Sequence, residues 1–262
     1  MREWNFIFQV SGPSFDLRKK YVLLEAFFNI ISRMKNIVVF GGGDQAKMIH
    51  SICQSASRNV SVSEAKNSSQ NLTPMSIKYY VVHEAKNQPD FLQFNTWLDK
   101  FSTEFQAGIV GVGDNFTRRK IASQIHTARP QFVFVTVIHQ QTTIDPTVVV
   151  GRGTVIMPGA IINTGSKIGE HVVVNTGSII EHDCHIQNFA TVAPGAVLGG
   201  HVSVGENSFI GLGAKIIQQI TIGSNTVIGA GSVVTENIPD NVLAYGNPCR
   251  VIRTRQPDEK YL

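Results

Sequence analysis

The chain has 262 residues, of which 42% are hydrophobic and 16% are charged, a composition typical of a globular protein and not of a disordered one. No run approaches the ~18 apolar residues of a membrane-spanning helix, and the net charge of +4 comes without a clustered Lys/Arg stripe, so neither a membrane span nor a nucleic-acid partner is expected. Three widely separated cysteines, Cys53, Cys184 and Cys249, suit reduced thiols in a cytoplasmic protein.

Residues 1–33 precede the first clear structural element. Their apolar run at residues 21–28 contains Glu25 and lacks a small-residue cleavage site, so it is a poor signal peptide. A typical first strand of an α/β domain opens at Met34. We therefore interpret residues 1–33 as an N-terminal extension and expect the fold to be complete without it.

Residues 34–140 predict a small Rossmann-like domain. Apolar runs predict its strands at 36–40, 79–82, 107–113 and 132–135. A glycine turn and a helix from Asp44 follow the first strand, and a basic helix follows the third. The Ser- and Asn-rich stretch at residues 55–76 is expected to be a loop. This alternation of strands and helices indicates a parallel sheet.

Residues 141–238 carry an internal repeat of six. From Ile144 to Val234 every sixth residue is aliphatic, sixteen times without an insertion, and four residues after each comes a mostly small one. Because side chains alternate along a strand, both positions point inward, and each hexapeptide is a short strand plus a corner. Three such sides close one coil of 18 residues, which predicts a β-solenoid of just over five coils. Cys184 falls in a small inward position and is expected to be a buried core thiol.

The repeat ends near residue 238, and residues 239–262 are expected to form a C-terminal tail with Arg250, Arg253 and Arg255. The period of six does not by itself define the hand of the coil, since most crossovers are right-handed.

The candidate catalytic residue is His182, two residues after an inward aliphatic and therefore pointing outward at a corner. Asp183 beside it can fix the tautomer of the imidazole and favour its charged form. Such a pair suits a base that takes a proton from an amine or hydroxyl attacking a thioester. One coil on, Gly200 leaves a corner without a side chain, where a thin pantetheine arm can pass.

Residues 34–252 resemble the family of sialic acid O-acetyltransferases and bacterial N-acetyltransferases of nucleotide-linked 4-amino sugars. The resemblance rests on the Rossmann-like domain, the uninterrupted repeat, the segment Ile-Ile-Glu-His-Asp-Cys at 179–184 and the Gly-Asn-Pro ending at 246–248. It implies a left-handed β-helix, His182 as general base and Asp183 as the residue that raises its basicity.

The resemblance also implies acetyl-CoA as co-substrate, no metal, and a homotrimer with acetyl-CoA between adjacent subunits. Its path would be lined by Thr191, Gly200, Leu212 and Ala230. Many relatives have His where this chain has Thr191. The implied sugar-binding positions are Gly43, Asp44, Gln45, His83, Glu84 and Gly113.

Relatives usually have Gly-His where this chain has Asp44-Gln45. A glycine turn at a helix N-terminus suits phosphate, whereas the Asp44 carboxylate would repel it unless it caps its own helix. Asn115 and the basic stretch 118–120 are expected to supply further polar contacts to the substrate.

The expected function is acetyl-CoA-dependent N-acetylation of a UDP- or GDP-linked 4-amino-dideoxy sugar in bacterial-type surface glycan biosynthesis. O-acetylation of a sialic acid-like sugar is the nearest alternative. A γ-carbonic-anhydrase-like metal hydratase would need three converging histidines, and the one cluster in the sequence is His182, His185 and His201. A scaffold without catalytic activity is the third possibility.

Overall fold

The computed structural model describes residues 36–58, 76–82, 91–93, 107–256 and 258–260. The expected extension at 1–33 and the candidate residues His83 and Glu84 lie outside these ranges.

The N-terminal domain is a parallel sheet with two described helices. Its strands are β1 (Asn36–Phe40), β2 (Ser76–Val82), β3 (Phe91–Gln93), β4 (Ala107–Val110) and β5 (Val133–Phe134). They lie in the order β3-β2-β1-β4-β5, and every neighbouring pair is parallel. The strand order reverses between β1 and β4, as at the ligand-binding crevice of Rossmann folds. The predicted Rossmann-like domain is confirmed.

The two helices bury opposite sides of this sheet. Along β1 the side chains alternate: Ile37 and Val39 pack with α2 (Asp44–Arg58), while Val38 and Phe40 pack with α4 (Asn115–Ala128). The α2 side also receives Val137 from the first coil of the solenoid and Val155 and Met157 from the second. The hydrophobic cluster on the α2 side of the sheet therefore contains residues of both domains, whereas the solenoid has a separate core of its own.

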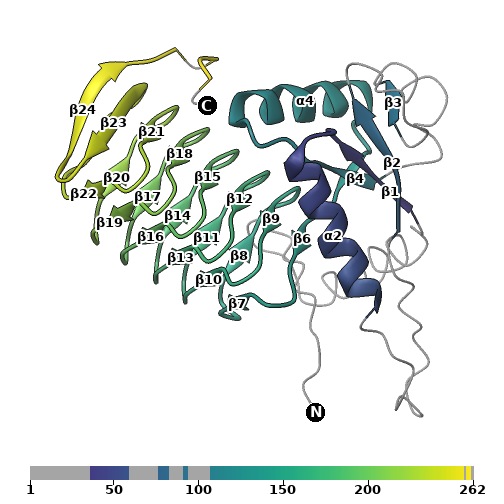
Figure 1. Cartoon of the computed structure of the whole chain (residues 1–262), viewed down its shortest axis with the longest axis horizontal. Coiled ribbons are helices and arrows are strands. Elements are labelled where there is room, and N and C mark those ends of the chain that lie inside the picture. The colour runs from purple at the N-terminus through teal and green to yellow at the C-terminus, as the bar shows by residue number, and fades with distance from the viewer. Residues whose placement is uncertain (1–35, 59–75, 83–90, 94–106, 257, 261–262) are drawn as a thin grey trace, which may run out of the picture.

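The C-terminal domain is a solenoid whose two-residue strands stack into three parallel sheets (Figure 1). Face 1 contains β6 (Val137–Ile138), β9 (Val155–Ile156), β12 (Val173–Val174), β15 (Thr191–Val192), β18 (Phe209–Ile210) and β21 (Val227–Ile228). Face 2 contains β7 (Thr143–Ile144), β10 (Ile161–Ile162), β13 (Ile179–Ile180), β16 (Val197–Leu198), β19 (Lys215–Ile216) and β22 (Val233–Val234). Face 3 contains β8 (Val149–Val150), β11 (Lys167–Ile168), β14 (His185–Ile186), β17 (Ser203–Val204) and β20 (Thr221–Ile222).

The repeat positions behave as the period of six predicts. The aliphatic second residue of nearly every solenoid strand lies in one continuous core together with the small inward residues, including Cys184. Burying one such aliphatic side chain contributes about 1.5–3 kcal/mol. Burial raises the pKa of the Cys184 thiol to about 11, which agrees with a core thiol and not with a nucleophile.

The solenoid begins one repeat earlier than predicted. β6 already pairs with β9, and face 2 has six strands, so there are about six coils instead of just over five. The reason is that β5 and β6 are separated by only Val135 and Thr136, so the last strand of the sheet and the first strand of the solenoid form one run of mostly apolar residues in the sequence. The left hand of the coil stays a prediction.

The C-terminal segment is more than a tail. β23 (Val242–Gly246) pairs in parallel with β21, and β24 (Cys249–Thr254) returns antiparallel to β23. Val242, Ala244 and Cys249 join the solenoid core. The hairpin thus covers the open end of the last coil and extends the sheet of face 1.

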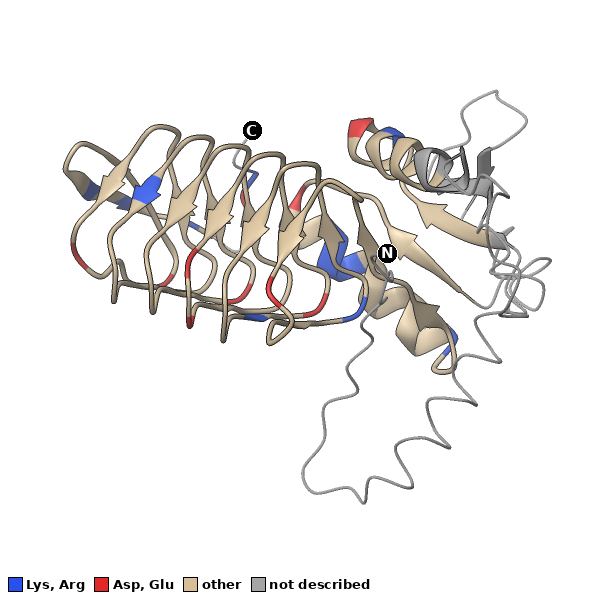
Figure 2. Cartoon of the chain, turned by 90° about the horizontal axis from the view of Figure 1, so that it is seen from below, with Lys and Arg blue, Asp and Glu red and all other residues tan. Residues whose placement is uncertain are grey.

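Charge is unevenly distributed over the solenoid. Among strands β6 to β22, Lys167 and Lys215 are the only residues of the types Lys, Arg, Asp or Glu, and Figure 2 shows acidic residues on the turns. No helix in the described part of the chain is long and apolar enough to cross a membrane.

Candidate active site

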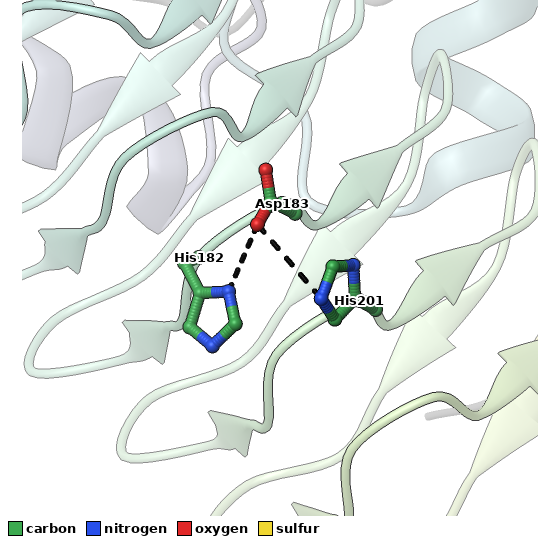
Figure 3. A group of neighbouring side chains, drawn as sticks. All are labelled: His182, Asp183 and His201. Carbon is green, nitrogen blue, oxygen red and sulfur yellow. Dashed lines mark hydrogen bonds and ion pairs between the residues drawn. The ribbon is translucent and has the colours of Figure 1, made fainter.

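His182 and Asp183 occupy the corner between β13 on face 2 and β14 on face 3. Their neighbours Ile180 and Cys184 point inward and are fully buried, so these two side chains point outward. His182 Nδ1 lies 2.9 Å from Asp183 Oδ2, and both side chains are half exposed (Figure 3). The hydrogen bond from His182 is the main cause that lowers the pKa of Asp183. With Asp183 ionised, Nδ1 carries the proton and the lone pair of Nε2 is left to accept another.

The backbone of this corner is fixed by the coils on either side. Asp183 N donates to Thr164 O at 2.9 Å, and His201 N donates to His182 O at 3.0 Å. Asp183 itself has a φ of 57°, in the left-handed region where Asp is tolerated better than most residues. The pair is therefore held by solenoid stacking rather than by a free loop.

Gly200 lies directly beside the imidazole of His182. A Cβ on Gly200 would stand 2.5 Å from His182 Nε2 and 2.6 Å from Cε1. The space that a side chain at position 200 would need is therefore taken by the ring of His182. The passage of a pantetheine arm beside Gly200 stays a prediction. Because Gly200 has no side chain, the imidazole of His182, the candidate catalytic base, can lie against its backbone.

His201, considered from the sequence only as a candidate metal ligand, lies at this site beside Asp183. Its Nε2 lies 3.9 Å from Asp183 Oδ2, and its ring stands edge-on to that of His182 with centroids 5.1 Å apart. His185, which was grouped with these histidines, begins β14 and is not part of this cluster. The 18-residue period of the coil predicts the contact between His201 and Asp183, because His201 lies one coil after Asp183.

Two glycine turns meet at the switch point of the N-terminal sheet. Gly111 N donates to Phe40 O at 2.8 Å, and a Cβ on Gly41 would stand 2.6 Å from Gly111 O. Gly43 and Gly113, by contrast, have open space where a Cβ would be. The structure thus brings these two candidate positions to the same edge of the sheet.

The first turn of α2 differs from the expectation for Asp44. Lys47 N donates to Gly43 O at 3.2 Å, so Gly43 is the helix cap and Asp44 is the first helical residue. The interpretation of Asp44 as N-cap is wrong, because its carboxylate forms a 3.0 Å ion pair with the Lys47 ammonium instead. Beside it, Gln45 Nε2 is buried and has no hydrogen-bond partner in the described part of the chain.

The α4 residues expected at the substrate are buried against the solenoid. Arg118 is 1% exposed; its Nε donates to His171 O at 2.9 Å and its Nη2 donates to Thr191 Oγ1 at 3.1 Å. Thr191 donates in turn to Asn115 Oδ1 at 2.6 Å. Asn115 Nδ2 donates to Ser208 O at 3.0 Å, one coil further on. The expectation that Asn115 and Arg118 contact the substrate directly is therefore wrong, because they attach α4 to three successive coils. Arg119 is half exposed and lies 3.6 Å from Glu206.

The four cofactor candidates do not form one patch on a single chain. Thr191 lies under α4 on face 1, and Gly200 lies at the His182 corner. Leu212, which is 59% exposed, and Ala230 stack one coil apart at the corner between faces 1 and 2. Their common role stays a prediction.

Comparison with known proteins agrees with this architecture. The family model "Bacterial transferase hexapeptide (six repeats)" matches residues 201–236. GDP-perosamine N-acetyltransferase from Escherichia coli O157:H7 is 32% identical over 111 residues, which is 42% of this chain and about half (48%) of that relative. PerB from Caulobacter crescentus, solved in complex with CoA and GDP-perosamine, is 30% identical with a TM-score of 0.71, covering 83% of this chain and 97% of PerB.

The chain belongs to the hexapeptide-repeat acetyltransferases.

A second solved member of this acetyltransferase family has the same arrangement of domains. The acetyltransferase domain of PglB from Neisseria gonorrhoeae FA1090, in complex with acetyl coenzyme A, is 29% identical with a TM-score of 0.71, and the match covers 83% of this chain and 99% of that domain. The resemblance inferred from the sequence is thereby confirmed at the level of the family.

Proposed function

We propose that the protein transfers the acetyl group of acetyl-CoA to the amino group of a nucleotide-linked amino sugar. The observation that carries the proposal is the outward His182–Asp183 pair, with Nδ1 of the imidazole 2.9 Å from the carboxylate. It stands in a chain that aligns with nearly the whole of PerB, a structure that contains CoA and GDP-perosamine.

The pair supplies the proton chemistry of this reaction. The uncharged sugar amine attacks the thioester carbonyl, so that a C–N bond forms and the C–S bond breaks. His182 Nε2 accepts the proton that the nitrogen loses and returns it to the leaving sulfur, so that CoA departs as the thiol and the base is restored. Asp183 stabilises the imidazolium that forms, since an adjacent carboxylate favours the charged ring. An amine needs no second activating group, which favours N- over O-acetylation.

The crevice between β1 and β4 is the proposed acceptor site. The Gly43 and Gly113 turns have open space beside them. The N-terminus of α2 after Gly43 suits phosphate oxygens, whereas at the start of α4 Thr117 N already donates to Asp114 Oδ1 at 2.8 Å. Gln45 adds a buried amide donor with no partner in the described residues. The Asp44 carboxylate, the feature least suited to phosphate, is partly offset by its ion pair with Lys47.

We propose a homotrimer as the working assembly. The nearly uncharged strands of the solenoid can be covered by neighbouring copies, and cyclic symmetry repeats such contacts. Gly200 and the Leu212–Ala230 pair occupy different corners, as expected for a cofactor groove made by two chains. Because acetyl-CoA and nucleotide sugars are metabolites of the cytoplasm, the same proposal includes a cytoplasmic location.

Substrate competition tests the proposal. Acetylated product would be quantified with acetyl-CoA and either a UDP- or GDP-linked 4-amino-4,6-dideoxy sugar or free sialic acid at equal concentration. We expect the higher kcat/KM on a nucleotide-linked sugar, and a decrease of about 10²–10⁴-fold in His182→Ala. His185→Ala, an exposed histidine outside the cluster, is the control. A higher kcat/KM on sialic acid would instead establish the O-acetyltransferase alternative.

A further inference from the structure

We propose that His182, Asp183 and His201 bind a divalent transition-metal ion such as Zn²⁺, and that the bound ion inhibits the enzyme. The metal is an inhibitor at this site and not a cofactor. Its binding stands on the geometry of the corner alone, whereas the inhibition rests on the proposed function.

The three side chains converge on one point outside the solenoid (Figure 3). One nitrogen of each histidine and one oxygen of Asp183 all lie within 4.8 Å of one another. Asp183 Oδ2 is in the middle, 2.9 Å from His182 Nδ1 and 3.9 Å from His201 Nε2. Each side chain is about half exposed, so small rotations can tighten the group and water can complete the coordination.

The donor set matches the preference of zinc. Two imidazole nitrogens and a carboxylate oxygen, bound at about 2.0–2.2 Å, form the kind of three-ligand site that leaves a position for water. Tetrahedral donors at those bond lengths stand about 3.4 Å apart, which lies between the two observed distances to Asp183. Hard cations such as Mg²⁺ and Ca²⁺ prefer oxygen ligands and do not fit a set of two imidazoles.

Solenoid stacking places these ligands before any metal arrives. Asp183 and His201 are equivalent residues of adjacent coils, with φ values of 57° and 58°. The equivalent residues one coil before and one coil after are Gly165 and Gln219, which offer no such ligand. The carboxylate and the second imidazole therefore project in parallel at this one level of the corner.

Metal binding would remove the base by changing its tautomer. A neutral imidazole has one protonated nitrogen and one lone pair. When the lone pair of His182 Nδ1 coordinates the metal, the ring proton must reside on Nε2. Nε2 then has no lone pair with which to accept the proton of the sugar amine, and Asp183 is engaged by the ion instead of by His182.

Calorimetric titration tests the site without any enzymatic readout. Tag-free full-length protein, treated with chelator and dialysed, would be titrated with Zn²⁺ alone. Loss of a mere hydrogen-bond partner of a metal ligand weakens binding about 10- to 100-fold, so His201→Asn should weaken the tightest site at least that much. His185→Asn removes an equally exposed imidazole outside the cluster and should bind like the wild type. Asn at position 201 suits its left-handed backbone.

The outcomes separate this proposal from the proposed function. Equal binding by wild type, His201→Asn and His185→Asn would mean adventitious ions elsewhere and overturn the site. Asp183→Asn, a second ligand variant, should also weaken binding, which guards against misfolding of one variant. Calorimetry decides these points even if no acetyl transfer is detected.

Inhibition is then measured as acetylated product by chromatography, because released CoA thiol binds Zn²⁺ and disturbs thiol reagents. Each variant is compared with its own metal-free rate. We expect inhibition of the wild type and of His185→Asn over the concentration range that fills the site, and none in His201→Asn. Full turnover by metal-saturated wild type would overturn the inhibitory role.

Discussion

Gly200 controls the position of the proposed base. A methyl group at this position would meet the His182 ring at 2.5 Å, and the backbone of Gly200 is held by the hydrogen bond from Gln219 N, so Gly200→Ala should displace the half-exposed imidazole. We expect kcat to fall about 10²-fold, the usual cost of a misplacement near 1 Å, while the melting temperature stays close to that of the wild type. In a His182→Ala background the same substitution should have no further effect on kcat. Unchanged kcat in the single variant would mean that the ring does not lie over Gly200 during catalysis.

His171 makes the stability of the fold dependent on pH. It is 3% exposed, stacks on Phe189 and has an unpartnered Nδ1 among the described residues. Burial, followed by the charges of Arg118 and Arg152, lowers its pKa from 6.5 to about 3. Between these two values the unfolded state binds a proton that the native state does not, so the free energy of unfolding decreases as pH falls from 6.5 towards 3.

The size of this effect is at most about 1.4 kcal/mol per pH unit. Urea unfolding at several pH values from 7.5 to 4.5 measures it, with His171→Asn as the comparison because Asn tolerates the φ of 55° at this position. The variant should be less stable at pH 7.5 but lose less stability on acidification. Parallel slopes for the two proteins would assign the acid sensitivity to other groups.

The residues of the site were predictable to the extent that the coil period applies. Position within the hexapeptide gave the outward direction of His182 and Asp183, and the 18-residue coil gave the contact with Gly200. The same period implies the approach of His201 to Asp183, although the sequence alone groups His201 only with His182 and His185 as candidate metal ligands. The prediction that Asp44 is the helix N-cap relied on the statistical preference of Asp for that position. In the structure the carbonyl of Gly43 accepts the first helical hydrogen bond, so the cap lies one residue earlier.

At the scale of elements, α4 joins the two domains by buried hydrogen bonds, beside the apolar contact on the α2 side. The guanidinium of Arg118 donates to the carbonyls of Val112, Gly113, His171 and Phe189, so it ties the Gly113 turn to the solenoid. Arg118→Met would leave buried carbonyls unsatisfied, at about 1–3 kcal/mol each. We expect a loss of at least about 2 kcal/mol in unfolding free energy and faster proteolysis within α4.

Arg119→Met is the matched control, because its neighbouring guanidinium is half exposed and pairs only at 3.6 Å with Glu206. An exposed pair of this kind contributes about 0–1 kcal/mol. If both substitutions changed stability equally, the buried network of Arg118 would not be what holds α4 in place.

The contact between α4 and face 1 of the solenoid is the part of the fold that the hexapeptide period cannot predict. The repeat predicts which residues of face 1 point outward, but it does not predict which element covers them. The alternation of predicted strands and helices likewise indicates a parallel sheet, but it does not indicate which part of the solenoid packs against that sheet and its helices. From the sequence alone, Arg118 is therefore expected to contact the substrate, and its hydrogen bond to Thr191 is not predicted.

At the scale of the whole molecule, the prediction concerns assembly. Multi-angle light scattering at micromolar concentration should give a mass three times that of one chain, because nearly uncharged strands and the separation of cofactor positions over two corners both favour association. A variant with Leu212→Asp, which adds charge at the exposed corner between faces 1 and 2, should dissociate more readily on dilution. A monomer at micromolar concentration in the unaltered protein would refute the trimer.

The stacked coil also restricts how the gene can change in length. Moving from one corner to the next takes six residues, so inserting a single hexapeptide between His182 and Gly200 would carry the glycine to a different edge of the prism and leave the imidazole without its seat. Eighteen inserted residues would keep the edge but separate the two by an additional layer. Insertions that leave the contact between His182 and Gly200 intact should therefore be multiples of 18 residues, and they should lie after the coil that contains Gly200 and His201.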